Sequence, residues 1–173
     1  GNTARTLTLN FSSLAGVLAT AIINTGGAVP YEGVPMQIRC KASTTITIAT
    51  TGTFTTGSTF DVSVFLDTQA ESVNAIEMSL AFPPDKLQLV SPATSRSIIS
   101  IWTSQPKFNN ATGRIDLQGG IPGGINVSNG LITTLSFRVK SVGSATLKFL
   151  DNSKVLLNDG LGTDVLRRTQ NGV

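Results

Sequence analysis

Histidine is absent from this sequence of 173 residues. Its absence excludes Ser-His-Asp and Cys-His nucleophile systems, histidine metal sites and the most common general base. Cys40 is the only cysteine, which excludes an internal disulfide and a structural zinc site built from cysteine pairs. Hydrolytic chemistry would have to rest on the 10 acidic residues, whose spacing fixes no catalytic pair. The sequence therefore predicts a protein that is not an enzyme.

Charge and long apolar runs are also scarce. Only 13% of the residues are charged, and the basic ones are scattered, with Arg167 and Arg168 as the largest cluster. We therefore expect no nucleic-acid partner, because such binding needs a concentrated basic face. The most apolar run, Leu14 to Ile23, has about ten residues, whereas a membrane-crossing helix needs about twenty. We therefore expect that the chain does not span a membrane. We also expect that any signal peptide has already been removed ahead of Gly1.

Strand and turn residues, in contrast, are abundant. The chain is rich in Thr, Ser, Val and Ile and holds 17 Gly and 7 Pro, a composition typical of short strands joined by tight turns. From residue 44 onward apolar and polar residues alternate with the two-residue period of strands that bury one face. Strands are predicted near residues 44–49, 59–66, 73–82, 86–90, 114–118, 130–140, 144–150 and 153–158. This pattern predicts an all-β protein with an antiparallel β-sandwich.

Residues 1–43 differ from the rest, and we predict that they form an N-terminal arm in front of a sandwich of residues 44–173. The arm holds an alternating run from Thr6 to Phe11, an apolar run from Leu14 to Ile23, and a connector rich in Gly and Pro. The apolar run fits a helix face and equally well a strand that is buried on both faces. The sequence leaves both alternatives open.

An arm with this many apolar residues needs a surface to pack on. Either it folds back on its own sandwich, or it adds a strand to a neighbouring copy, which is called donor-strand complementation. For the first run, burial of its apolar side chains contributes about 5 to 9 kcal/mol, and ordering its backbone costs about 6 to 12 kcal/mol. The second run would therefore decide whether the arm docks. The candidate subunit-contact residues are Leu7, Leu9, Phe11, Leu14, Val17, Leu18 and Ile22.

Two further features could bind a ligand. Asp151, Asp159 and Asp164 crowd one end of the chain and are candidate calcium ligands, although their spacing is not that of an EF-hand and Asp-Gly is first a turn signal. We expect no other metal or cofactor. Trp102 is a candidate for stacking on a sugar ring, and the alternative is that it is buried in the sandwich.

Three segments in the second part of the chain match a known pattern of strands and breaks: Gly57–Val64, Val73–Val90 and Gly130–Lys140. With them, residues 44–168 resemble a cohesin domain, the β-sandwich module that docks dockerins in cellulosomes and recurs in bacterial surface proteins. The resemblance implies a cohesin-like sandwich of the jelly-roll or immunoglobulin-like kind, with an N-terminal extension. It also implies a core that contains Leu80, Phe82, Leu87, Leu89, Phe137 and Val139.

The resemblance implies an extracellular or cell-surface location of the bacterial type. Together with the arm and the lack of catalytic groups, it predicts a structural or adhesion subunit. In this hypothesis the arm packs into a neighbouring copy, so that the protein forms a homo-oligomer, a filament or a surface array. The alternative hypothesis is a recognition module that binds a dockerin or a polysaccharide through the sandwich face.

Overall fold

The computed structural model describes residues 5–8, 20–23, 43–50 and 52–172, and the chain divides into two units, residues 1–39 and 40–173. In the first unit, β1 (Arg5–Thr8) pairs antiparallel with β2 (Thr20–Ile23). Leu7 therefore lies opposite Ala21, and Ile22 opposite Thr6. The strand alternative for the apolar run is confirmed over its last part, β2. The contact candidates outside the described residues are Leu9, Phe11, Leu14, Val17 and Leu18.

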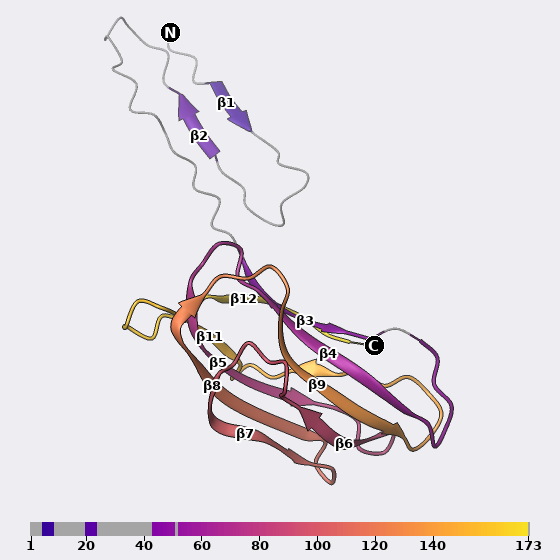
Figure 1. Ribbon diagram of the computed structural model, residues 1–173. Helices are drawn as coiled ribbons and strands as arrows, with labels where there is room; N and C mark the ends of the chain where they lie inside the picture. Colours follow the sequence, from indigo (N-terminus) through magenta and orange to yellow (C-terminus); the bar gives the residue numbers. More distant parts are fainter. Residues whose placement is uncertain (1–4, 9–19, 24–42, 51, 173) are drawn as a thin grey trace, which may run out of the picture. The chain divides into compact units, whose positions relative to one another are not determined.

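The second unit contains two β-sheets that lie against each other as a sandwich (Figure 1). The first sheet has, in spatial order, β12 (Leu166–Gln170), β3 (Thr44–Ala49), β4 (Thr59–Asp67), β9 (Gly130–Val139) and β6 (Leu87–Ala93). In the second sheet, β5 (Val73–Ala81) pairs on one side with both β10 (Lys148–Phe149) and β11 (Lys154–Leu157). On its other side β5 pairs with β8 (Arg114–Ile125), and β8 pairs with the edge strand β7 (Ile101–Asn109).

The pairing is antiparallel throughout these two sheets except between β12 and β3, which run parallel, with Leu166 opposite Thr44 and Gln170 opposite Thr47. The prediction of an all-β, mainly antiparallel sandwich is confirmed. In the part of the chain that the structure describes, no helix has the length and apolar character needed to cross a membrane.

The predicted strands agree with the observed ones where the alternation is strict. β3, β4, β5 and β9 begin where the sequence places them, within a residue or two at each end. The strand predicted over 144–150 shrinks to β10. Before it, Leu147 forms only an isolated bridge with Gly172, and after it Leu150–Ser153 form a turn. β7 and β12 were not predicted: β7 contains Pro106, which sheets accept at an edge, and β12 is largely charged and polar.

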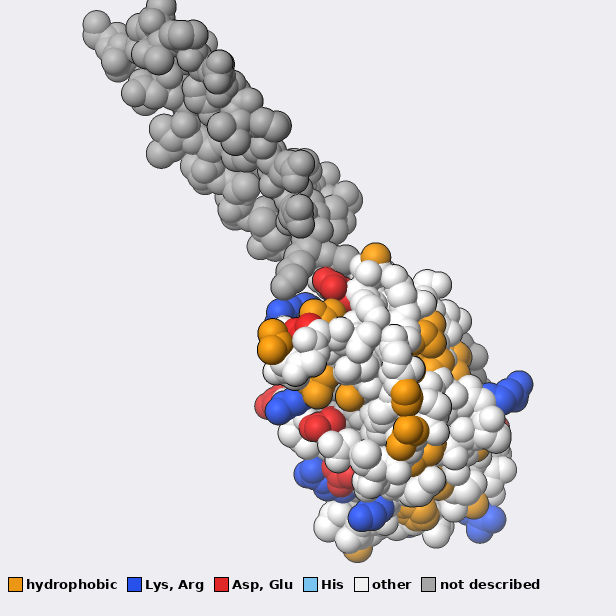
Figure 2. Space-filling view, turned by 60° about the vertical axis from the view of Figure 1, so that its left-hand side comes forward, with side chains coloured by type: hydrophobic (Ala, Val, Ile, Leu, Met, Phe, Trp, Pro, Cys, Tyr) orange, Lys and Arg blue, Asp and Glu red, His pale blue; other side chains and the backbone are white. Residues whose placement is uncertain are grey.

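The surface of the sandwich is mainly uncharged. Figure 2 shows polar side chains and backbone over most of the visible face, with hydrophobic side chains in small separate patches and charges of both signs near one another. Large apolar side chains that are exposed in the described residues include Ile101, Phe108, Val142 and Leu161. These exceptions matter because a module that binds a protein partner usually exposes its anchoring residues.

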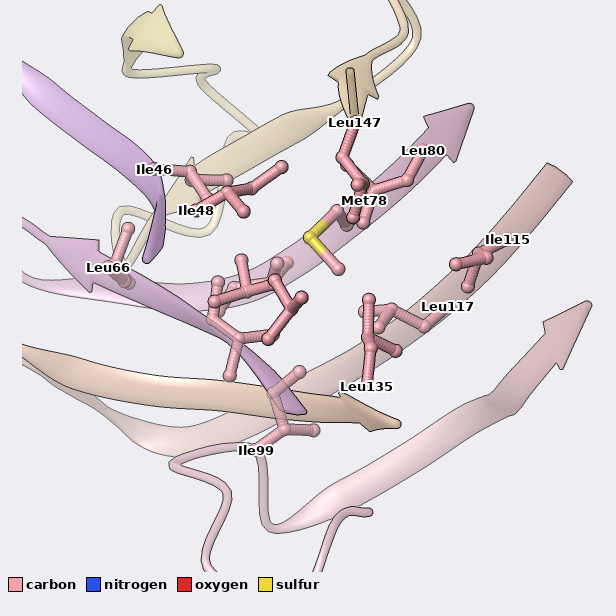
Figure 3. Close-up of a cluster of buried hydrophobic side chains, with 14 of the residues drawn as sticks. Ile46, Ile48, Leu66, Met78, Leu80, Ile99, Ile115, Leu117, Leu135 and Leu147 are labelled. Atoms are coloured by element: carbon pink, nitrogen blue, oxygen red, sulfur yellow. The ribbon is translucent and has the colours of Figure 1, made fainter. Parts of the chain in front are cut away.

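The core is formed by inward-facing residues of both sheets. Figure 3 shows Ile46, Ile48 and Leu66 of the first sheet together with Met78 and Leu80 of the second. Burial of alternate residues explains the two-residue period that most of these strands show between their register shifts. The predicted core residues are all buried, which confirms that part of the prediction: Leu80, Phe82, Leu87, Leu89, Phe137 and Val139.

Gly119 of β8 lets the edge strand β7 approach closely. It pairs with Trp102, and a Cβ atom at position 119 would lie 2.3 Å from Cγ2 of Ile99 and 2.7 Å from the carbonyl oxygen of Ile101. Both distances are shorter than van der Waals contact. The neighbouring Gly120 has room, because a Cβ atom there would meet only the Asn74 carbonyl oxygen, at 3.7 Å.

Gly119→Ala should therefore destabilise the sandwich by about 1 to 3 kcal/mol, the usual cost of overpacking a well-filled site. Gly120→Ala is the matched control, and its free energy of unfolding should change by less than about 0.5 kcal/mol. Urea unfolding followed by Trp102 fluorescence measures both variants. Equal stability of the two variants would contradict the close approach of β7 at Gly119.

Candidate binding face

The second sheet presents a polar outer face whose residues are fixed by the alternation of its strands. On β5, Met78 and Leu80 point into the core, so Glu77 and Ser79 point outward. On β8, the buried Ile115 and Leu117 alternate with Arg114, Asp116 and Gln118. The outward residues of β5, β7, β8, β10 and β11 are called here the candidate face.

A hydrogen-bonded network holds the centre of the candidate face. The Nε and Nη2 atoms of Arg114 donate to the two carboxylate oxygens of Asp116 at 2.7 and 2.8 Å. The buried Ser79 donates its hydroxyl to Asp116 at 2.6 Å and accepts a hydrogen bond from Asn152 Nδ2 at 2.7 Å. Because each polar group has a partner, the network holds the side chains in one arrangement.

Ser79 stands where the sheet edge is interrupted between β10 and β11. Here the hydroxyl of Ser153 replaces a strand partner, because it accepts from the Ser79 amide at 3.1 Å and donates to the Ser79 carbonyl at 3.2 Å. The Leu150 amide also donates to that carbonyl, at 2.9 Å. The turn of residues 150–153 is thereby fixed to the sheet, and it delivers Asn152 to the candidate face.

The network changes the acidity of its members. The hydrogen bond from Arg114 lowers the pKa of Asp116 below its usual value of 3.8, the hydrogen bond from Ser79 also lowers it, and partial burial opposes both. The same hydrogen bond and charge raise the pKa of Arg114. Both groups are therefore charged at neutral pH.

Beyond this network the candidate face carries more positive than negative charge. Gln118 Nε2 donates to Glu77 at 2.7 Å, and Lys154 lies opposite Glu77 in the register of β11 and β5. Lys107 lies opposite Asp116, and Lys148 opposite Ala81. The cations Lys107, Arg114, Lys148 and Lys154 thus share the candidate face with two acidic groups, Glu77 and Asp116.

One end of the candidate face is apolar. Gly120 of β8 lies between Ile101 of β7 and Ala75 of β5, and Leu156 of β11 pairs with Ala75 on its other side. Ile101 is 55% exposed. Because Gly120 and Ala75 are small, the middle of this row is open to an incoming group.

A hydrogen-bonded loop presents one more apolar side chain at the same end. Leu161 is 84% exposed and lies in the loop between β11 and β12, which projects from the sandwich in Figure 1. Asp159 accepts hydrogen bonds from the Leu161 amide at 2.8 Å and from the Thr163 hydroxyl at 2.5 Å, and these bonds lower its pKa. Asn158 fixes the base of the loop, because its amide donates to the Ser72 carbonyl and its side chain to the Gly123 carbonyl.

Two of the three acidic residues predicted as calcium ligands accept hydrogen bonds from the chain itself. Asp159 closes the loop around Leu161, and Asp164 accepts from the amides of Val155 and Leu166 at 3.2 and 3.0 Å. Asp151 is exposed in the turn before β11. Within the described part of the chain, no three His, Cys, Asp or Glu side chains gather in a way that could hold a metal ion.

Trp102 lies on the inner side of β7, where it is half-buried and packs against the core. Sequence reasoning missed Ile101 of the candidate face and Leu161 of the loop at its end. The alternation in residues 114–118 indicated which β8 side chains point outward, but no local signal distinguished an exposed Leu161 from a buried one.

Solved cohesin structures resemble this sandwich in fold. The third cohesin ScaC of Acetivibrio cellulolyticus, in complex with the ScaB dockerin, matches with a TM-score of 0.63 and 18% identity over 75% of this chain and 95% of that chain. The sixth cohesin of scaffoldin B from the same organism, in complex with a mutant Cel5 dockerin, gives 0.61 and 17% over 75% and 96%. The sandwich has the cohesin fold.

The OlpC cohesin from Clostridium thermocellum, solved in a type I cohesin–dockerin complex, also matches the cohesin-like sandwich. Its TM-score is 0.60 and its identity 12%, over 76% of this chain and 91% of that chain. No protein-family model matches the sequence, and neither does any curated protein. The resemblance predicted for residues 44–168 is therefore confirmed as a shared fold.

The charge network of the candidate face predicts a pH dependence of stability. In the folded chain the pKa of Asp116 lies below its usual value of 3.8. The contribution of its charge to stability is therefore fully present above pH 3.8, and it is lost as the pH falls through the lower pKa of the folded chain. The wild type should therefore exceed Asp116→Asn in free energy of unfolding at pH of about 6, and the difference should shrink toward pH of about 2. Urea unfolding at a series of pH values measures it, and a constant difference would contradict the ionic origin.

Proposed function

We propose that the cohesin-like sandwich is a non-catalytic recognition module that binds a dockerin-type helical protein through the candidate face. The observation that carries this proposal is the apolar end of the face, where the exposed Ile101 lies beside the small residues Gly120 and Ala75. The loop of the exposed Leu161 is anchored at the same end, near the start of β5 and the end of β8. Anchoring residues of this kind, next to a fixed polar centre, are typical of protein–protein interfaces.

The composition of the candidate face favours a protein partner over a polysaccharide. Carbohydrate platforms present flat aromatic rings, whereas Trp102, Phe108 and Phe149 pair with residues that point into the core, namely Gly119, Ile115 and Leu80. The cations of the face also support a partner whose contacting surface is acidic, because opposite charge on the two surfaces speeds association. Cohesins of the same fold have been solved in complexes with dockerins, which supports a dockerin as the partner.

We propose as a second function that the N-terminal arm joins copies of the protein at a cell surface, as a structural or adhesion subunit. The hairpin of β1 and β2 has only four residues in each strand. A two-stranded hairpin of this size is at best marginally stable in water, so it needs a third strand or a packing surface. That requirement supports engagement with a sheet edge, in the same chain or in a neighbouring copy.

If Leu161 anchors the partner, Leu161→Ser should weaken dockerin binding by about tenfold or more, as loss of a central apolar anchor does. Val142→Ser is the matched control, since Val142 is 79% exposed in the loop before β10, away from the candidate face. Isothermal titration calorimetry against a panel of type I and type II dockerins measures both variants. An equal loss in both variants, or binding of none of the dockerins, would contradict the proposal.

If the arm joins copies, the full chain should form oligomers or fibres that a variant lacking residues 1–43 does not form. Light scattering after size exclusion and negative-stain microscopy at high concentration compare the two proteins, and circular dichroism confirms that the shortened variant keeps its β-sheet signal. Monodisperse monomers of both proteins would contradict the second function and leave the recognition proposal standing.

A further inference from the structure

A cavity of about 330 Å³ opens at the end of the sandwich that lies away from Leu161. It is lined by residues that follow β3, by the start of β4, by the turn between β5 and β6, and by the end of β9 with the loop that follows. The loop of Leu161, in contrast, is fixed to Ser72 and Gly123, near the start of β5 and the end of β8. The end cavity is therefore separate from the candidate face, and its volume falls in the range of small-ligand sites, about 300 to 1,000 Å³.

An aromatic wall forms one side of the end cavity. The ring of Phe54 stacks on that of Phe60, with centroids 4.0 Å apart and planes at 13°. Phe60 continues inward to Phe137 of the core, at 6.0 Å, which fixes its position. Phe54 is the outermost ring of this series and is 39% exposed, so it offers a flat apolar surface to a ligand.

Thr50 also lines the end cavity, and its hydroxyl group is buried beside it. Thr50 Oγ1 is the one buried side-chain polar atom in the described residues that has no hydrogen-bond partner. A buried polar group without a partner is unfavourable, and native proteins rarely keep one unless something binds to it. The Thr50 side chain would turn about its Cα–Cβ bond to offer this buried hydroxyl to a ligand atom in the cavity.

Lys86 is the charged residue among those that line the end cavity. Its ammonium group donates to the Val142 carbonyl at 2.9 Å, which holds it beside Gly143, and it forms a long, exposed salt bridge with Asp85 at 3.9 Å. An ammonium group has three donors, so Lys86 can bind an anion while it keeps its contact with Val142. The charge of the end cavity is thus complementary to a carboxylate.

From this combination we propose that the end cavity binds a small ring-shaped carboxylate, which is an anion with one flat apolar face. The ring lies against Phe54, an acceptor atom takes the hydrogen bond of Thr50, and the carboxylate pairs with Lys86. Aromatic acids and hexuronic acids share this chemistry. The two sources differ in whether the ring carries hydroxyl groups that can reach the serine and threonine side chains of the lining.

The test is an NMR titration of the ¹⁵N-labelled full chain with benzoate and with glucuronate, and with benzyl alcohol and glucose as their neutral counterparts. One of the carboxylates should cause saturable shifts of the Gly52 and Gly143 amide signals. Its neutral counterpart should bind with an affinity at least about tenfold lower. Binding of benzoate would identify the ligand class as aromatic acids, and binding of glucuronate would identify it as hexuronic acids. No saturable shift with either acid, or equal binding of acid and neutral counterpart, would overturn the proposal.

Variants separate the three parts of the site. Lys86→Gln should weaken binding of the acid about tenfold, whereas Lys107→Gln, on the candidate face, should leave it unchanged. Thr50→Val should raise the melting temperature of the free protein, because it removes an unpartnered hydroxyl, and should weaken binding of the acid. An unchanged affinity in Lys86→Gln would overturn the proposal. Leu161→Ser should leave binding of the acid intact, so this result does not depend on the dockerin experiment.

Discussion

The structure depends on the burial of alternate residues from two facing sheets. On β5 this constraint points Ile76, Met78 and Leu80 into the core and leaves Glu77 and Ser79 on the outside. A slip of one residue in the register would exchange the two sets and place a carboxylate in the apolar interior. The chemistry of the candidate face is therefore fixed by the core beneath it.

Ser79 is the point where the core and the candidate face are joined. It faces outward but is buried, since Asp116 and Asn152 bond to its hydroxyl and Ser153 bonds to its backbone. The gap between β10 and β11 would otherwise leave the Ser79 amide without a strand partner. Side chains of the turn fill this gap, so an interrupted edge becomes a rigid polar surface rather than a weak point.

The strict two-residue alternation made much of the fold predictable, because burial of one strand face leaves a direct trace in the sequence. The strands β3, β4, β5 and β9 and the core residues Leu80 and Phe137 follow from it. The edge strands β7 and β12 left a weaker trace, since an edge strand is half-solvated and tolerates Pro106 or the pair Arg167 and Arg168.

The candidate face could be predicted only in part, because it is made by register and by loops. Alternation indicates that Arg114 and Asp116 point to the same side, but their contact with Ser79 depends on the pairing of β5 with β8, which no local pattern specifies. The exposure of Leu161 depends on the hydrogen bonds of Asp159 and Asn158. The end cavity likewise unites Thr50, Phe54 and Lys86 from segments that are distant along the chain.

The parallel pairing of β12 with β3 has a mechanical consequence. Because Leu166 lies beside Thr44 and Gln170 beside Thr47, the chain enters this sheet at one end of the strand pair and leaves it at the other. Tension applied through the flanking polypeptide would pull β3 and β12 in opposite directions along their own axes. Their hydrogen bonds, which run across the strands, would then be loaded together in shear and would have to rupture as a group. Rupture of the β3–β12 pair by such tension would therefore need more force than opening the same hydrogen bonds one at a time.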